Sequence, residues 1–134
     1  MKESLKADIK GQKSKLTKLF TKHNDAGHGW LEVSYKDITD LNIQNDISEF
    51  SYINKTIESI FLEEDCDMSL FCKAYKAKYN KEIQFQVIEK FEEHPIRDLP
   101  RYTSWQFNLY LNPLKGKELS EYLDKQVKLN RGRL

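Results

Sequence analysis

The densest group of side chains that can do chemistry is an acidic run near the middle of the chain. Glu63, Glu64, Asp65 and Asp67 all fall within five consecutive positions. Carboxylates this close together can bind Mg²⁺ or Ca²⁺, because hard cations take oxygen ligands. The run lacks the spacing of an EF-hand and a glycine that would shape a loop around an ion. We therefore interpret it as a solvated negative segment that also caps a helix, and we predict no metal site.

Histidine and cysteine side chains offer a second chemistry. His28 lies between two glycines, and it could join His23, His94 and Cys66 at a zinc ion. Their spacing matches no compact zinc motif, and a nucleophilic Cys66–His28 pair would still need a third group to orient the imidazole. The chain also has no GxSxG, P-loop, GxGxxG or HExxH motif. We therefore predict a protein that is not an enzyme, with no catalytic residues, metal or cofactor.

Charge is segregated along the chain. Residues 24–67 carry eleven acidic side chains against two basic ones, whereas each flank has a net charge of +5 and the whole chain has +1. Strong fields of both signs favour electrostatic docking to a partner. We expect the partner to be a protein, bound through an acidic face. The residues predicted to form this face are Glu58, Glu63, Glu64, Asp65 and Asp67.

Basic side chains support an alternative function, the binding of nucleic acid. The residues predicted for such binding, or for a second protein contact, are Lys6, Lys10, Lys13, Lys18, Arg97 and Arg101. A high density of lysines attracts phosphates, and the two arginines stand beside Tyr102 and Trp105, a mixture found in single-strand binders. A competing interpretation places the lysines on the wet side of an amphipathic helix and pairs the arginines with the acidic block. No RRM, KH or helix-turn-helix signature is present.

These residues must be positioned by a small number of helices and strands. Hydrophobic periodicity predicts helices over residues 2–22, 35–41 and 114–128, with Ser34 capping the second. A further helix follows the acidic run and is predicted to be capped by Asp65 or Asp67. Strands are predicted at residues 30–33, 47–53, 57–62 and 105–111, and a half-buried strand at 83–91. The second and third of these strands form a hairpin, and Pro95 and Pro100 bound an irregular loop.

The predicted fold class is α+β, with a small, mainly antiparallel sheet of about four strands covered by helices. The element order between residues 29 and 91 is β-α-β-β-α-β. Three regions are expected: a basic amphipathic helix over 1–23, an α+β core over 24–112, and a helix with a basic tail over 113–134. A chain of 134 residues is long enough for one hydrophobic core.

Composition predicts a cytoplasmic protein with no membrane partner. The first residues contain no apolar signal segment, and no stretch approaches the roughly 18 apolar residues of a membrane span. Two cysteines, Cys66 and Cys72, indicate a reducing compartment without a disulfide framework.

Four segments carry a resemblance to a known family: residues 28–33, 47–52, 61–67 and 96–102. Over about residues 27–102, the chain resembles a family of small, functionally uncharacterised proteins carried by tailed phages, prophages and conjugative plasmids. The chain departs from that family at Phe50 and Phe61, where Tyr is usual, and at Asn42, where a left-handed glycine is usual. Asn is the residue that best tolerates this conformation after glycine.

The resemblance implies a genomic setting and supplies no catalytic residues. Inhibitors of host restriction and CRISPR systems are common among the accessory proteins of mobile elements. We therefore expect a phage or plasmid protein that binds a host protein, such as a nucleic-acid-processing defence complex, in the host cytoplasm. Its expected role is that of an anti-CRISPR or other anti-defence protein.

Overall fold

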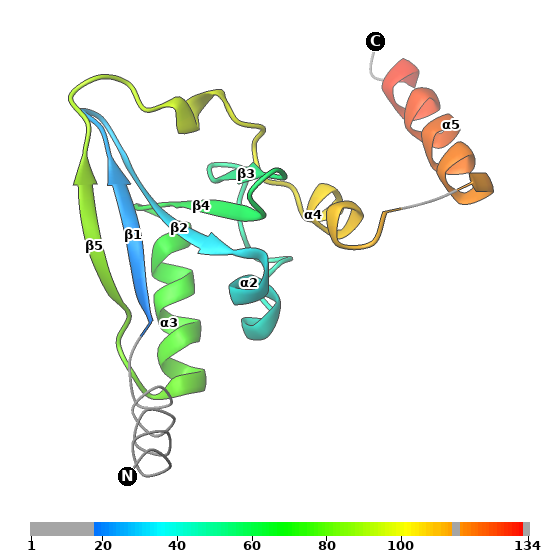
Figure 1. The fold of residues 1–134 in the computed structure, drawn as a ribbon. Helices are drawn as coiled ribbons and strands as arrows, with labels where there is room; N and C mark the ends of the chain where they lie inside the picture. Colours follow the sequence, from blue (N-terminus) through cyan, green and yellow to red (C-terminus); the bar gives the residue numbers. More distant parts are fainter. Residues whose placement is uncertain (1–17, 114–115, 133–134) are drawn as a thin grey trace, which may run out of the picture. The chain divides into compact units, whose positions relative to one another are not determined.

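The computed structural model of this chain describes residues 18–113 and 116–132. The chain divides into two units, of which the first ends at Thr103 and the second runs from Ser104. The first unit has the predicted α+β fold, and Figure 1 shows its sheet beside the long helix α3 (Asp67–Tyr79). None of the described helices is both long and apolar enough to cross a bilayer.

The sheet has five strands, in the order β3-β4-β2-β1-β5. Their bounds are β1 Leu19–Asn24, β2 Gly29–Ser34, β3 Tyr52–Asn54, β4 Ser59–Glu63 and β5 Gln84–Glu89. All neighbouring strands are antiparallel except β1 and β5, which are parallel. The sheet is therefore mixed, with one strand more than predicted. The order from β2 to β5, with helices α2 (Tyr35–Leu41) and α3 between strands, confirms the predicted β-α-β-β-α-β sequence.

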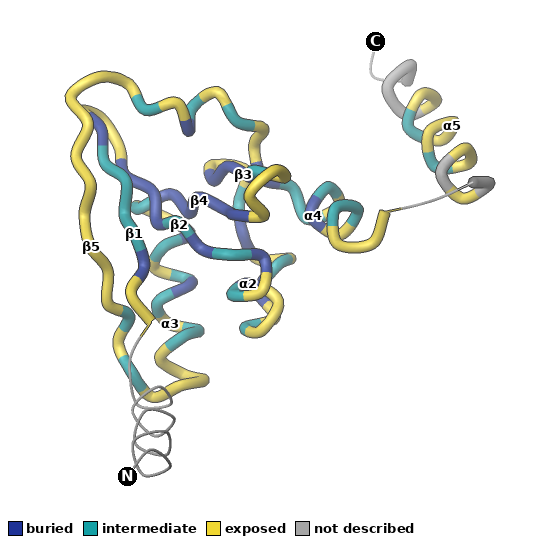
Figure 2. Tube along the Cα trace, viewed as in Figure 1, coloured by how far each residue is buried: buried dark blue, intermediate teal, exposed yellow. Residues whose placement is uncertain are grey.

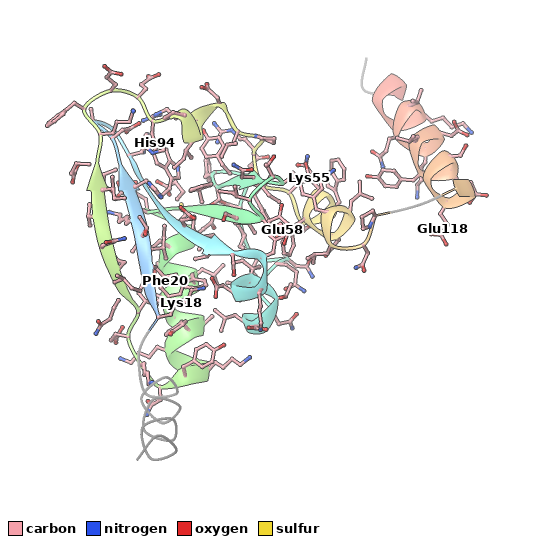
Figure 3. The ribbon with its side chains drawn as sticks, in the orientation of Figure 1. Lys18, Phe20, Lys55, Glu58, His94 and Glu118 are labelled. Atoms are coloured by element: carbon pink, nitrogen blue, oxygen red, sulfur yellow. The ribbon has the colours of Figure 1, made fainter. Side chains whose placement is uncertain are left out.

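Strand β1 corrects the prediction of a helix over residues 2–22. Residues 2–17 lie outside the described part, and the chain from Leu19 onward is extended. Phe20 is buried against α3, where its ring meets the edge of Phe71 at 5.4 Å between centroids. Figure 3 shows Lys18 and Phe20 at the start of this strand. Side chains that alternate between two faces are typical of a strand. The sequence analysis assigned a helix instead, because residues 19 and 20 also fit the helical spacing of the apolar residues before them.

The two faces of the sheet are covered differently. Residues opposite each other in neighbouring strands point to the same side, so Trp30 and Glu63 share a face with Phe61 and Tyr52. On this side, which we call the loop face, Ile96 and Leu99 pack against the aromatic rings. On the opposite side, the helix face, the strands carry the fully buried side chains Leu31, Val33, Ile60 and Leu62. Figure 2 shows how burial concentrates in β2 and β4.

Helix α2 begins and ends as the sequence predicts. The Asp37 amide donates to Ser34 Oγ at 3.0 Å, and the Ser34 amide donates back to Asp37 Oδ2 at 2.8 Å. This reciprocal capping box satisfies two amides that have no partner inside the helix. The helix ends at Asn42, whose φ of 54° and ψ of 43° are left-handed. Asn42 therefore adopts the left-handed conformation that we expected at this position.

Helix α3 starts without the predicted cap. The N-cap position is Cys66, which makes no side-chain capping bond, and Asp67 lies in the first turn. The Asp67 carboxylate points away from the helix end and accepts hydrogen bonds from Ser48 and Ser51. The prediction that Asp65 or Asp67 caps this helix is therefore wrong, because Cys66 occupies the N-cap position and the Asp67 carboxylate binds Ser48 and Ser51 instead.

The predicted strand at 105–111 is also wrong, since these residues form helix α4 (Ser104–Leu111). Apolar residues alternate along this stretch, which mimics a strand, and short apolar runs are ambiguous between the two periods. In the helix, Phe107 is fully buried and Gln106 donates to the Tyr110 hydroxyl one turn later, at 2.6 Å. Helix α5 (Gly116–Gly132) agrees with the predicted C-terminal helix.

A test of this local chemistry is the substitution of Asn42. We expect Asn42→Ala to lower the free energy of unfolding by about 1 kcal/mol, because Cβ makes the left-handed conformation costly for alanine. Asn42→Gly should cost nothing or stabilise slightly, since glycine adopts this conformation without strain. Urea unfolding followed by circular dichroism measures both variants. Equal stability of the two variants would contradict the left-handed cap.

Candidate functional site

A surface cavity with a volume of about 390 Å³ lies on the loop face of the first unit. We call it the motif pocket, because each of its nine lining residues belongs to one of the four sequence segments 28–33, 47–52, 61–67 and 96–102. The lining residues are His28, Trp30, Phe50, Tyr52, Glu63, Asp65, Cys66, Arg97 and Arg101. Segments up to 73 positions apart, from residue 28 to residue 101, therefore meet at one place.

The aromatic residues of the motif pocket form its floor and rim. Trp30 comes from β2 and Tyr52 from β3, and both are buried, with centroids 6.2 Å apart. The Arg97 guanidinium stacks over Trp30 at 5.2 Å and that of Arg101 over Tyr52 at 5.1 Å. Such cation–π contacts hold the arginines flat against the floor. Phe50, in contrast, is 57% exposed and stands at the rim.

A buried carboxylate holds the arginine-bearing segment in place. Asp25, in the turn between β1 and β2, has a side chain only 1% exposed. It accepts from Arg97 Nε at 2.8 Å and Nη2 at 3.0 Å, and from the backbone amides of Gly27, His28 and His94 at 2.9–3.0 Å. The Arg97 guanidinium, supported by these amides, holds the pKa of the Asp25 carboxyl far below its usual range. Asp25 is therefore ionised throughout the physiological range.

A second buried carboxylate positions the rim. Asp67 accepts from the Ser48 amide at 3.1 Å, from Ser48 Oγ at 2.7 Å and from Ser51 Oγ at 2.5 Å. Ser51 Oγ in turn accepts from the Glu63 amide at 3.0 Å. These bonds join the start of α3 to the residues on either side of Phe50, which lines the motif pocket together with Tyr52.

One wall of the motif pocket gathers groups that can ligate a metal. Glu63 Oε2 accepts from the Asp65 and Cys66 amides, whereas Glu63 Oε1 faces His28 Nδ1 at 3.9 Å. Ligand atoms of His28, Glu63 and Asp65 all lie within 4.8 Å of one another. An imidazole and two carboxylates at this separation can hold a divalent cation after small side-chain adjustments. Sequence spacing alone did not indicate this grouping, because His28 and Glu63 are brought together by pairing of β2 with β4.

The pocket cysteine is not poised as a nucleophile. Partial loss of water around the sulfur, reinforced by the neighbouring Glu63 carboxylate, raises the pKa of the Cys66 thiol. Reactive cysteines require the opposite shift, because the thiolate is the attacking form. His94 borders the same floor, 6.3 Å from Trp30, and burial lowers the pKa of its imidazole. Its Nδ1 accepts from the Ile96 amide at 3.1 Å, which fits a neutral ring that anchors the loop.

The carboxylates predicted to form one acidic face are divided among different surroundings. Glu63 and Asp67 are buried and accept hydrogen bonds from the fold. Glu64 is half-buried and accepts from Lys22 Nζ at 2.7 Å. Glu58 is exposed in the turn between β3 and β4, which also contains Lys55; both are labelled in Figure 3. Asp65 is exposed at the pocket. The five residues therefore do not form a single solvent-facing surface, because two of them are structural.

The predicted basic contacts are likewise separated. Lys6, Lys10 and Lys13 lie outside the described residues, and Lys18 forms an ion pair with Asp37 at 2.8 Å. Arg97 pairs with Asp25. This agrees with the competing interpretation, in which the arginines pair with the acidic block within the fold. Arg101 donates to the Glu49 carbonyl at 3.2 Å and lines the motif pocket.

The residues that sequence reasoning missed are chiefly Asp25 and the aromatic floor and rim, Trp30, Tyr52 and Phe50. Asp25 lies at a turn, where Asp is common, so its type carries no special signal. The aromatic residues lie in the segments 28–33 and 47–52 that the sequence analysis singled out, and that signal could have identified them. No protein-family model, no curated protein and no solved structure matches this chain. The fold and the motif pocket thus characterise it as a mixed-sheet α+β protein with a polar and aromatic surface site.

Removal of the Asp25 charge tests how the pocket is anchored. We expect Asp25→Asn to lower the free energy of unfolding at pH 7 by about 3 kcal/mol, because it leaves Arg97 without its partner. The native pKa of Asp25 lies below the unfolded value of about 3.9, so its contribution is present above that pH and is lost as the pH falls. The gap between the variant and the wild type should therefore narrow below about pH 4 in urea unfolding experiments.

A matched control is Asp98→Asn, since Asp98 is an exposed carboxylate in the short 3₁₀ helix η1 (Pro95–Asp98), which also holds Arg97. It should change stability by less than about 0.5 kcal/mol. Equal effects of the two substitutions, or a gap that does not change between pH 7 and pH 3, would refute the role given to Asp25.

Proposed function

We propose that this chain is a non-enzymatic protein that acts by binding a host protein, and that the motif pocket is its docking site. The observation that carries the proposal is the origin of the pocket lining, since all nine residues come from the four segments that resemble the mobile-element family. That resemblance supports a phage- or plasmid-borne protein that inhibits a CRISPR or restriction system in the host cytoplasm.

The composition of the pocket suits protein recognition. Trp, Tyr and Arg are the residues that most often dominate binding energy, and they do so in pockets at the centre of an interface. Here Trp30, Tyr52, Arg97 and Arg101 are held by packing and hydrogen bonds, so little side-chain entropy remains to be lost on binding. Phe50 adds an exposed apolar surface at the rim.

Charge favours a basic side chain of the partner as the group that enters the pocket. Asp25 neutralises Arg97, which leaves Arg101 as one positive charge against the carboxylates of Glu63 and Asp65. A partner lysine or arginine can lay its aliphatic stem against Phe50 and direct its charge to Asp65. Such a contact keeps the expected attraction between the acidic block and a basic partner. It limits the acidic residues involved to those that line the motif pocket.

Nucleic-acid binding through the N-terminal lysines, Arg97 and Arg101 stands as the second candidate. Within residues 18–113, the contacts of Lys18 with Asp37 and of Arg97 with Asp25 count against it, because both cations are already paired.

The substitution Phe50→Ala tests the proposed docking site. It removes an exposed ring without opening the core, so the fold should be unaffected. Binding should fall by about tenfold or more, since the exposed aromatic contact at the rim of the pocket is lost. The measurement is quantitative capture of the partner from an extract of the host, followed by titration of the purified partner by calorimetry.

The matched control is Phe91→Ala, because Phe91 is 97% exposed and lies outside the motif pocket. Asp65→Lys provides a second arm, which should weaken binding and make it less sensitive to salt. Partner binding that is equal for the Phe50→Ala and Phe91→Ala variants would rule out the motif pocket as the docking site.

A further inference from the structure

Strand β5 leaves one edge of the sheet open. It is the last strand in the sheet order and, among the described residues, pairs only with β1. All six of its residues are exposed, as Figure 2 shows along its length, which corrects the prediction of a half-buried strand. Phe85, Val87 and Ile88 are each between 40% and 48% exposed.

The opposite edge of the sheet is covered by the chain itself. The Ile53 amide in β3 donates to the Pro100 carbonyl at 2.9 Å, and the Tyr102 amide donates to the Ser51 carbonyl at 2.8 Å. Open edges with apolar side chains readily pair with another strand, and proteins usually protect them with proline, charge or a covering segment. Strand β5 contains no proline, and its only charge is at its last residue, Glu89.

The direction of the backbone groups defines what the open edge offers. The Lys90 amide donates to the Asn24 carbonyl in β1 at 2.9 Å, so even-numbered residues turn their backbone groups toward β1. Phe85, Val87 and Glu89 therefore present their N–H and C=O groups outward. Phe85 lies opposite Phe20 of β1, which places the odd-numbered side chains on the helix face.

The odd-numbered residues in and just before β5 form favourable side-chain pairs with the same residues of an antiparallel second copy. Read in order, they are Lys81 and Ile83, which lie in the bend and loop just before the strand, and Phe85, Val87 and Glu89 within it. With β5 extended back to Lys81, an antiparallel second copy centred on Phe85 sets Phe85 against Phe85, Ile83 against Val87 and Lys81 against Glu89 across the junction. Aromatic, β-branched and opposite-charge pairs of this kind each stabilise a sheet. A register displaced by two residues in either direction loses the Lys81–Glu89 pair.

We propose that a second copy of this chain pairs with it through the β5 edges, antiparallel and centred on Phe85. The two five-stranded sheets then form one continuous sheet. A twofold axis perpendicular to that sheet keeps both loop faces on the same side, so the dimer presents two motif pockets in one direction. Two linked sites raise the apparent affinity for a partner that also has two copies of its site. The dimer does not depend on the proposed docking function.

A charge exchange tests the register. Sedimentation velocity of the full chain over a range of concentrations should show a monomer–dimer equilibrium. Lys81→Glu and Glu89→Lys should each raise the dimer dissociation constant by about tenfold, because like charges then face each other twice across the axis. The double variant restores opposite charges and should recover the wild-type constant. Recovery separates pairing between copies from the bond that Glu89 accepts from Asn24 in its own chain, at 3.2 Å.

Two further variants complete the test. Lys90→Glu is the matched control, since it reverses a neighbouring charge that has no charged counterpart in this register, and it should leave the constant unchanged. Phe85→Asp should give a monomer. The proposal is overturned by a monomer at every concentration in the wild type, by a dimer that withstands Phe85→Asp, or by failure of the double variant to recover.

Discussion

The pairing of Asp25 with Arg97 is the constraint on which the site depends. A carboxylate with a side chain 1% exposed is stable only when its charge is fully compensated, and here five hydrogen bonds provide that compensation. The donors come from the turn between β1 and β2 and from residues 94–97. The bond network therefore fastens the segment that covers the loop face to the hairpin beneath it. Both pocket arginines lie on this segment or just beyond it.

The same principle explains why much of the acidic block is internal. Asp67 accepts hydrogen bonds from Ser48 and Ser51, and Glu63 accepts from two amides of the turn that follows β4. These carboxylates accept hydrogen bonds from backbone amides and hydroxyl groups that would otherwise have no partner in the irregular segments. The carboxylates of Glu63 and Asp67, which the sequence analysis placed on an acidic surface, therefore hold loops together. What faces the solvent at the motif pocket is the smaller remainder, chiefly Asp65.

Local signals in the sequence were sufficient for elements with strong end markers. Ser34 and Asp37 mark the start of α2, and Asn42 marks its end, so these features were predictable. Strand β1 was not, because a helical pattern running through a lysine-rich segment also fitted its first residues. In α4 the error was the opposite one: the apolar residues alternate, which predicted a strand, but a short apolar run fits the helical period as well as the strand period. The site depends on non-local pairing: only the register of β2 with β4 sets His28 near Glu63, and only Asp25 brings Arg97 to Trp30.

We propose that four separate segments build one partner-binding pocket on the loop face. Amide hydrogen exchange, measured by mass spectrometry in the free protein and in complex with the captured host protein, tests it most directly. If the four segments form one docking site, exchange should be slower in the complex for all four peptides that contain residues 28–30, 50–52, 63–66 and 97–101. Protection confined to other parts of the chain, with exchange at these four segments unchanged, would contradict it.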